Sequence, residues 1–475
     1  MRYSSILLLV LYISVIGYGK TAPEQNRYLL LDSRIIAKAN NAKLVVGRAD
    51  KYDGNPLFVE DKPWEKRIDN MYGNVVFDEE ENIYKLWYSP FIIDNSARNM
   101  SLEKRKAIPY DPPDEREMAV CYAISSDGIY WEKPEMGLVE YEGSKANNIL
   151  LRGEGVMGDH WGGPHGAGIF IDTHDSDPSR RYKAILKADI ISVSFSSDGI
   201  SWSAPVPCPE ADVAGDTHNN AFWAPTLGKY VAITRTWGSN EEGHGYRQVG
   251  RTESDDFLSW SEAKVVLEGT SRRYQTYAMP TFYYAGVYLG LLAIHDQKRD
   301  RVWTELAWSP DTKDWQRISE GQPLIGCSDG PLAYDYGCVY ACATPVFLKD
   351  EIRLYYGGSD WLHFGWRLGS FALATLRPDG FAGFEQESAE QKAVILTESI
   401  PYDQHPIRIT ADVYKGGSVR VLALDANGST IAKSRKIKKS MTDYQLEFRK
   451  KISSESIQLQ FEFSKAKIYS FGFAD

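Results

Sequence analysis

The heptapeptide Ser125-Ser-Asp-Gly-Ile-Tyr-Trp131 returns almost unchanged as Ser196-Ser-Asp-Gly-Ile-Ser-Trp202. An Asp-Gly turn followed by an aromatic residue is typical of a tight hairpin between two β-strands, with the tryptophan packed against the sheet. Looser copies of the element follow at residues 254–260, 309–315 and 377–381. The copies are roughly 55 to 70 residues apart, a spacing that accommodates one four-stranded unit each.

A second feature precedes every copy of the turn: an apolar strand, a short turn, and another strand rich in Tyr, Leu and Ile. These pairs occupy residues 74–89, 166–187, 220–235, 278–294 and 343–357. Five units with one internal order predict an all-β protein with a five-bladed β-propeller, because radial repetition leaves only short sheet edges. A tandem of β-sandwiches is the alternative, and the constant order within the units favours the propeller.

The two ends of the chain differ from the repeat. Arg2 precedes a short apolar run at residues 6–17, which predicts a signal peptide over residues 1–21. The propeller is expected over residues 22–384 and is followed by a polar linker and short alternating strands. These strands predict a C-terminal β-sandwich over residues 393–475, which we expect to pack against the propeller or to bind glycans weakly. The protein should therefore be secreted or periplasmic, without membrane insertion.

The charge and the cysteines exclude several classes of function. A net charge of −10 over 475 residues argues against nucleic-acid and anionic-membrane partners. The cysteine spacing matches no zinc motif, so we expect most of these residues to be small buried hydrophobes. The five are Cys121, Cys208, Cys327, Cys338 and Cys342. No cofactor is expected, and the sequence carries no signal for a particular oligomeric state.

The first strands of the five units align on their last aromatic residue. In a propeller the first strand of each blade lines the central channel, so equivalent positions gather around it. The aligned aromatics are Phe77, Phe170, Trp223, Phe282 and Phe347. Five residues earlier stand Tyr72, His165, His218, Tyr277 and Cys342, and seven residues earlier stand Asn70, Gly163, Asp216, Gln275 and Tyr340. These mostly polar residues predict a small-molecule site at one mouth of the channel.

Three acidic residues are the candidates for catalysis: Asp69, Asp216 and Glu253. Asp69 and Asp216 lead into the first strands of two units, where use of the aspartate in a turn or cap is the alternative. Arg251 and Glu253 stand where other units have mostly apolar residues between blades, and burying charges needs a reason. They either form a salt bridge between blades or place a carboxyl of tuned pKa near the site.

Glycosidic hydrolysis needs two carboxyl groups on opposite sides of the bond, one as the acid and one as the nucleophile or base. Asp69 would face Asp216 or Glu253 across the channel. The expected substrate-binding residues are Asn70, Tyr72, Asp159, Trp161, His165, His218, Arg251 and Tyr277. Two histidines and an aspartate could bind a metal, but no HxH or HExxH spacing supports this, so no metal is expected.

The segment around Asp69 resembles secreted bacterial proteins related to glycoside hydrolase families 32, 43 and 68. The resemblance rests on Trp64-Glu65, Asp69-Asn70, Tyr72 and Asn74-Val-Val76, together with the Asp-Gly turns. It implies a five-bladed propeller acting on fructans, arabinans, xylans or related glycans and, for family 32, a C-terminal β-sandwich. Asp69-Asn70 is closest to the family 32 motif Trp-x-Asn-Asp-Pro-Asn-Gly, whereas the Arg-Asp-Pro and Glu-Cys motifs of that family are absent.

The resemblance also implies roles for the carboxylates. Asp69 would be the nucleophile or base, Asp159 or Asp216 the stabiliser, and Asp216 or Glu253 the acid. We therefore expect a glycoside hydrolase, exo-acting on an oligosaccharide or polysaccharide. Two alternatives remain: a non-catalytic propeller that binds glycans, and an inverting glycoside phosphorylase. In the second case phosphate would be surrounded by His165, His218 and Arg251.

Overall fold

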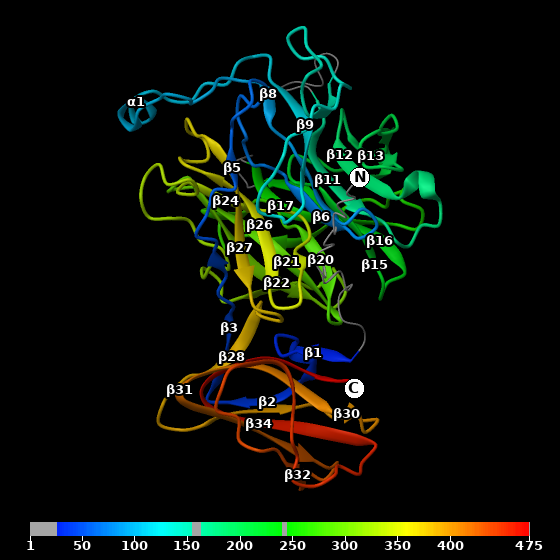
Figure 1. Ribbon diagram of the computed structural model, residues 1–475, viewed down its shortest axis with the longest axis vertical. Helices are drawn as coiled ribbons and strands as arrows, with labels where there is room; N and C mark the ends of the chain where they lie inside the picture. The colour runs from blue at the N-terminus through cyan, green and yellow to red at the C-terminus, as the bar shows by residue number, and fades with distance from the viewer. Residues whose placement is uncertain (1–25, 154–162, 240–244, 475) are drawn as a thin grey trace, which may run out of the picture.

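The computed structural model describes residues 26–153, 163–239 and 245–474. The predicted signal peptide lies outside these ranges, as do two predicted site residues, Asp159 and Trp161. The described chain is almost entirely β-structure and forms two bodies, a larger one above a smaller one in Figure 1. Within the described ranges, no helix is long and apolar enough to cross a membrane.

Five antiparallel meanders, called units 1 to 5, make up the larger body. Unit 1 contains β6 (Asn74–Asp78), β7 (Ile83–Tyr88), β9 (Glu117–Ser125) and β10 (Ile149–Arg152), with β8 (Phe91–Ile93) and helix α1 (Leu102–Ala107) before β9. Unit 2 contains β11 (His165–Ile171), β12 (Tyr182–Lys187), β13 (Ile191–Ser196) and β14 (Val206–Pro207). Unit 3 contains β15 (Asn220–Ala224), β16 (Lys229–Ser239), β17 (Gly245–Ser254) and β18 (Lys264–Glu268).

In the last two units the first strand is split into two short pieces. Unit 4 contains β19 (Tyr274–Thr276), β20 (Thr281–Tyr284), β21 (Val287–Asp296), β22 (Arg301–Ser309) and β23 (Gln316–Ile318). Unit 5 contains β24 (Cys338–Ala341), β25 (Val346–Phe347), β26 (Ile352–Ser359) and β27 (Gly369–Leu376). A single parallel pair, Val302 with Cys338, joins the two units into one larger sheet.

The five units form a closed ring. Their first strands contact one another in order, β6 with β11, β11 with β15, β15 with β20, and β25 with β6. Phe282 of β20 packs against Phe347 of β25 and completes the circle. Two N-terminal strands, β4 (Asp50–Lys51) and β5 (Phe58–Val59), pair with β27 and supply the outer edge of unit 5. The start of the ring is therefore hydrogen-bonded to its last unit.

The repeated turn has the predicted hairpin chemistry. The Asp127 carboxylate accepts two backbone N–H groups of its own turn, at 2.8 and 2.9 Å. The Trp131 indole lies edge-on to Tyr355 and Phe371 of unit 5, so it packs between units. The same pair of backbone bonds recurs at Asp198, Asp256 and Asp311. The turn therefore fixes both the hairpin and the contact with the neighbouring unit.

The smaller body is a ten-stranded sheet built around two strands of 18 residues each, β31 (Ile407–Leu424) and β34 (Ser456–Phe473). Its other strands are β1 (Arg27–Leu29), β2 (Ile36–Asn40), β3 (Ala42–Val46), β28 (Ala382–Gln386), β29 (Ala393–Thr397), β30 (Ile400–Pro401), β32 (Thr430–Lys433) and β33 (Met441–Gln445). Strand pairing defines one sheet, so the β-sandwich stays a prediction.

The strand pairing does not follow the domain boundaries expected from the sequence. Strands β1 and β28 pair with β34, and β2 pairs with β29, so residues 27–46 and 382–386 belong to the sheet of the smaller body. Short local strands carry no signal for partners more than 300 residues away, which is why the boundary at residue 22 differs from the observed pairing.

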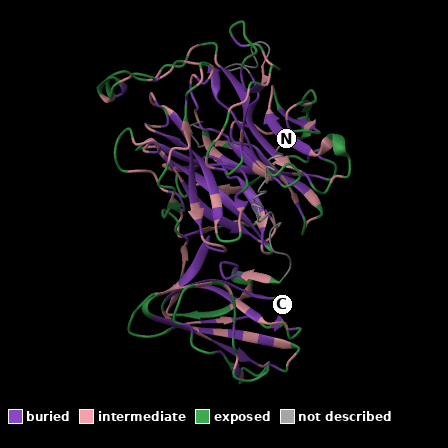
Figure 2. Ribbon diagram, in the orientation of Figure 1, coloured by how far each residue is buried: buried purple, intermediate pink, exposed green. Residues whose placement is uncertain are grey.

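Burial follows the strands of the ring, which are mostly buried, whereas the connections are exposed (Figure 2). All five cysteines are free thiols, and all but Cys327 are buried. The prediction that most of them are small buried hydrophobic residues is confirmed.

Candidate active site at one end of the ring

The aligned positions of the first strands mark the two ends of the ring. The five aligned aromatics line a single pocket of about 840 Å³, at the end where the first strands finish. These residues are Phe77, Phe170, Trp223, Phe282 and Phe347. The aligned positions therefore lie at the same end of all five first strands, and the residues that precede the strands belong to the opposite end.

At that opposite end the polar residues predicted from the alignment meet around Asn70. The Asn70 amide donates to the hydroxyl groups of Tyr72 and Tyr277, at 2.9 Å each. The Tyr72 hydroxyl lies 3.5 Å from Nε2 of His165, and its ring packs against the His218 ring. Units 1, 2, 3 and 4 thus each contribute a side chain to one cluster.

Asp69 is held by two arginines in this cluster. Nε of Arg67 and Nη2 of Arg367 donate to the same carboxylate oxygen, at 2.8 and 2.5 Å. Burial alone would raise the pKa of Asp69, but Arg367 and Arg67 outweigh it and hold the pKa below its ordinary value. Asp69 is therefore an anion throughout the neutral pH range, although only 13% of its side chain is exposed.

Asp216 is the second carboxylate of the cluster and the more exposed one, at 28%. One oxygen lies 3.1 Å from Nη1 of Arg235, and the other lies 3.6 Å from Nε2 of His165. Arg235 also donates to the backbone carbonyl of Tyr277, and its guanidinium lies 4.4 Å from the centre of that ring. The carboxylate is thus fixed at the rim of the cluster by units 2, 3 and 4.

The histidines of the cluster are neutral at physiological pH. Burial lowers the pKa of His165 to about 4, although Asp216 acts in the opposite direction. Burial also lowers the pKa of His218 to about 3, and its Nε2 lies 3.1 Å from Oδ1 of Asn74. Neutral imidazoles offer one donor and one acceptor each, which suits hydrogen bonds to sugar hydroxyl groups better than charge pairing with an anion.

Several side chains of this end were not singled out by the sequence. Arg67, Arg235, Arg247 and Arg367 bring four guanidinium groups to the cluster. A second histidine pair lies beside it, with the His295 and His363 rings 4.6 Å apart. Arg235 and His295 are polar residues that follow a largely apolar stretch of a second strand, in β16 and β21. A charged or polar side chain after such an apolar stretch is a pattern from which the sequence could have identified them. Arg367 follows a loop, and no local pattern points to it.

Glu253 and Arg251 do not join the cluster. Arg251 bonds Glu253 at 2.7 Å within β17 and donates to the Thr312 hydroxyl of unit 4 at 2.6 Å. Glu253 is paired across the sheet with Val231, four residues from Arg235 and toward the other end of β16. The ion pair therefore lies within one unit rather than between blades, and the contact with the neighbouring unit is the hydrogen bond from Arg251 to Thr312. The predicted catalytic and substrate-binding roles are not supported.

Glu60 fastens the segment that carries Asp69. One of its carboxyl oxygens accepts the backbone N–H groups of Ile68 and Gly369, at 2.7 and 2.8 Å. The other oxygen is buried and has no hydrogen-bond partner among the described residues. Burial raises the pKa of Glu60 to about 8, although the two backbone bonds act against it. Glu60 therefore holds the segment as a largely protonated acid at neutral pH.

The free energy of unfolding of the Glu60→Gln variant, measured relative to that of the unaltered protein, should increase as the pH rises from 5 to 8. The native state binds the Glu60 proton up to pH 8 and the unfolded state only up to about 4.3, so this group contributes less stability at higher pH. Glutamine keeps the two accepted bonds and does not titrate. Urea unfolding at pH 5 and pH 8 should show a relative gain on the order of 3 kcal/mol. An identical pH dependence in both proteins would contradict the prediction.

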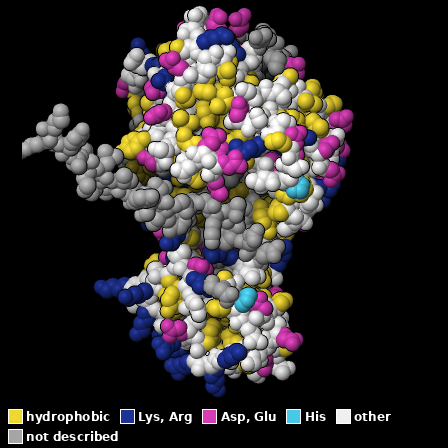
Figure 3. All heavy atoms as spheres, turned by 45° about the vertical axis from the view of Figure 1, so that its right-hand side comes forward, with side chains coloured by type: hydrophobic (Ala, Val, Ile, Leu, Met, Phe, Trp, Pro, Cys, Tyr) yellow, Lys and Arg dark blue, Asp and Glu magenta, His cyan; other side chains and the backbone are white. Residues whose placement is uncertain are grey.

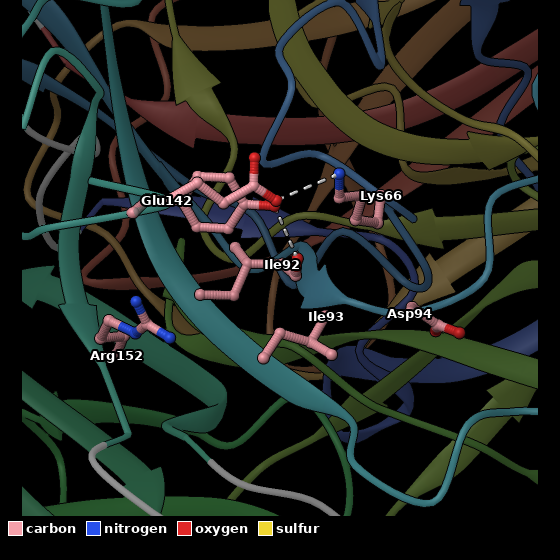
Figure 4. Close-up of a pocket in the computed structure, with 7 residues that line it drawn as sticks. Lys66, Ile92, Ile93, Asp94, Glu142 and Arg152 are labelled. Atoms are coloured by element: carbon pink, nitrogen blue, oxygen red, sulfur yellow. Dashed lines mark hydrogen bonds and ion pairs between the residues drawn. The ribbon is translucent and has the colours of Figure 1, made fainter. Parts of the chain in front are cut away.

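A small pocket of about 230 Å³ lies near this end, beside β8 (Figure 4). Lys66 and Glu142 face each other across it at 3.8 Å, and the Tyr141 hydroxyl donates to the carbonyl of Ile92. Its lining contains neither Asp69 nor Asp216. The pocket is therefore distinct from the carboxylate cluster.

No family model and no curated protein matches this sequence. Among solved structures, β-1,2-mannobiose phosphorylase from Listeria innocua has a TM-score of 0.47 at 14% identity, covering 69% of this chain and 96% of its own. An N-acetylgalactosamine deacetylase from F. plautii in complex with blood group B trisaccharide has a TM-score of 0.42 at 14% identity, covering 71% of this chain and 96% of its own.

A third solved structure is described with the words "The GH130 family of mannoside phosphorylases contains glycoside hydrolases that target beta-1,2 mannosidic linkages in Candida mannan". Its TM-score is 0.42 at 16% identity, covering 70% of this chain and 94% of its own. TM-scores below 0.5 at such identities assign this chain neither a family nor an activity. The resemblance to families 32, 43 and 68 is not confirmed.

Proposed function

We propose that the five units are the blades of a β-propeller. We further propose that the chain is a glycan-active enzyme that binds its substrate with the glycosidic bond placed between the carboxyl groups of Asp69 and Asp216 and cleaves that bond. One observation carries the proposal: a chain of contacts joins two arginine-bound carboxylates from different units. Arg367 contacts both Asp69 and Asn70, Asn70 donates to Tyr72, and the Tyr72 hydroxyl lies beside His165, which faces Asp216. Two carboxyl groups at one polar cluster are the minimum that glycoside cleavage requires.

The environment of each carboxylate suggests its role. Asp69 remains ionised because Arg367 and Arg67 stabilise the anion, so it acts as the nucleophile or as the base that activates water. Asp216 is the partner carboxyl and acts as the proton donor to the leaving oxygen. The neutral hydrogen-bonding groups between them would hold the sugar hydroxyls, and these groups are Asn70, Tyr72, His165, His218 and Tyr277.

An exo mode of action is favoured by the burial of the cluster. Tyr72, His165 and Tyr277, called the floor of the cluster, are 3%, 4% and 8% exposed, whereas the side chains of Asp69 and Asp216 are 13% and 28% exposed. We expect the terminal sugar of a chain to reach such a buried group of side chains more readily than the middle of a polymer. We expect the enzyme to act outside the cytoplasmic membrane, after removal of the predicted signal peptide.

Phosphorolysis is the second candidate, because the cluster contains more cationic than anionic groups. Arg67, Arg235, Arg247 and Arg367 outnumber the two aspartates, and guanidinium groups are well suited to phosphate oxygens. The phosphate ligands expected from the sequence differ from this set. His165 and His218 are neutral at pH 7, and Arg251 pairs with Glu253 within β17, away from the cluster.

The two candidates are separated by incubating the protein with a panel of oligosaccharides, with and without inorganic phosphate. Hydrolysis predicts free reducing sugar at the same rate in both conditions. A sugar phosphate that forms only with added phosphate would replace hydrolysis by phosphorolysis. If calorimetry detects oligosaccharide binding but neither product forms, the chain is a glycan-binding propeller and the enzymatic proposal fails.

A further inference from the structure

A dense group of cations covers one part of the smaller body. Eight lysines and arginines in residues 433–451 are all exposed, and they are called the basic face. Its members are Lys433, Arg435, Lys436, Lys438, Lys439, Arg449, Lys450 and Lys451. In the space-filling view, dark blue side chains gather along one edge of the smaller body (Figure 3).

The basic face is produced by two chain segments that run side by side. Residue 434 pairs with residue 448 in an antiparallel bridge, and the Arg449 N–H donates to the Lys433 carbonyl at 3.1 Å. Ile437, Leu446 and Ile452 point into the core of the smaller body. Because side chains alternate along an extended chain, burying these apolar residues turns the cations between them toward solvent.

The charge of this region is opposite to that of the rest of the chain. Residues 393–475 contain 13 Lys and Arg against 9 Asp and Glu, a balance of +4. The whole chain carries −10, so the remaining residues carry −14. An acidic protein that gathers its cations at one end has a dipolar charge distribution, which orients it toward polyanions.

The cations of the basic face are not neutralised within the protein. Among the described residues, the one ion pair found for these eight cations joins Arg435 to Glu447 at 3.0 Å, and both side chains are more than half exposed. An exposed pair of this kind contributes little free energy. Seven further cations repel one another without a carboxylate to offset them, so an external anion would lower their energy.

We propose that the basic face binds an anionic polysaccharide, a polymer that carries carboxylate or sulfate groups. A linear polymer matches a stripe formed by two adjacent segments. A membrane-binding face would combine cations with several exposed apolar side chains that insert between lipids, and here Tyr444 is the single large hydrophobic side chain of residues 433–451 that is exposed. The choice of polysaccharide among polyanions rests on the proposed glycan activity.

The placement of the basic face indicates what the binding achieves. Strand β32, whose last residue Lys433 is the first cation of the basic face, lies at the bottom of Figure 1, whereas β8 and β9 of unit 1 lie at the top. The basic face is therefore distant from the carboxylate cluster and takes no part in cleavage of the glycosidic bond. It would tether the enzyme to an acidic polymer and raise the local concentration of chain ends at the active site.

The test compares K436Q/K438Q/K439Q with the control K145Q/K298Q/K313Q, which neutralises three exposed lysines of the ring. Binding to polygalacturonate, neutral dextran, phosphatidylserine vesicles and duplex DNA is measured at increasing salt. We expect salt-sensitive binding to polygalacturonate that is about tenfold weaker in the basic-face variant and unchanged in the control. Dextran should not bind.

Equal binding of polygalacturonate by all three proteins would overturn the proposal, and so would binding of vesicles or DNA in preference to polygalacturonate. Both variants should cleave a short soluble oligosaccharide as fast as the unaltered protein, because none of the six lysines lies in the carboxylate cluster. The polygalacturonate assay therefore tests the basic face, whereas cleavage of the soluble oligosaccharide tests the proposed enzymatic function, and one proposal can fail without the other.

Discussion

Replacing Asp69 with asparagine should reduce kcat on the cleaved glycan by at least about a thousandfold, because the variant retains the shape of the side chain but loses its negative charge. The nucleophile or base must be an anion, and Arg367 and Arg67 keep Asp69 ionised. Steady-state kinetics at neutral pH, on samples whose circular dichroism matches that of the unaltered protein, measure the effect.

Glu253→Gln is the matched control for this substitution. It removes one carboxylate from the same ring, but Glu253 lies in the contact between units 3 and 4, so kcat should stay within about threefold of the unaltered value. A folded Asp69→Asn protein with normal turnover would remove Asp69 from the mechanism. A large loss in Glu253→Gln alone would restore the role that the sequence suggested for Glu253.

Replacing Arg367 with glutamine should lower the free energy of unfolding by about 3 to 5 kcal/mol. Arg367 is 1% exposed and donates to Asp69 and to the side-chain oxygen of Asn70. Its removal leaves the carboxylate with Arg67 as the remaining cation that contacts it directly. Breaking a buried ion pair costs more than the pair contributes, because Asp69 keeps only one of its two cations and the side-chain oxygen of Asn70 loses a donor. Urea unfolding measures the change.

The double variant Asp69→Asn with Arg367→Gln separates the ion pair from other effects of the substitutions. With both charges removed, the loss of stability should be smaller than the sum of the two single losses by at least about 1 kcal/mol. Strict additivity would mean that the two side chains do not interact energetically. Arg435→Gln is the control, since Arg435 forms an ion pair with Glu447 in which both side chains are more than half exposed, and its replacement should cost much less.

The ring was predictable from the sequence because its signals are local. Each turn places an Asp and an aromatic residue a fixed distance apart, and the same backbone bonds occur at Asp127, Asp198, Asp256 and Asp311. The closure of the ring was not predictable. It depends on pairing of β4 and β5 with β27, and such short strands contain no pattern that names a partner so far along the chain.

The carboxylate cluster was predictable in part. Alignment of the first strands brought together Asn70, Tyr72, His165 and Tyr277, because equivalent positions of a ring must converge. Of the arginines that bind the two aspartates, Arg235 comes from a second strand, whereas Arg67 and Arg367 come from the segments before β6 and β27, where the units are not equivalent. The prediction that Glu253 belongs to the active site was not supported. A charged residue at a position that is apolar in the other units indicates burial, but it does not show at which end of the strand the side chain lies.

The most direct test of the account is a crystal structure of the Asp69→Asn protein with an uncleaved oligosaccharide. We predict the terminal sugar on the floor formed by Tyr72, His165 and Tyr277, with the glycosidic oxygen about 3 Å from the Asp216 carboxyl group and the side chain at position 69 on the other side of the bond. A sugar bound only at the opposite end of the ring, in the aromatic-lined pocket, would contradict the account.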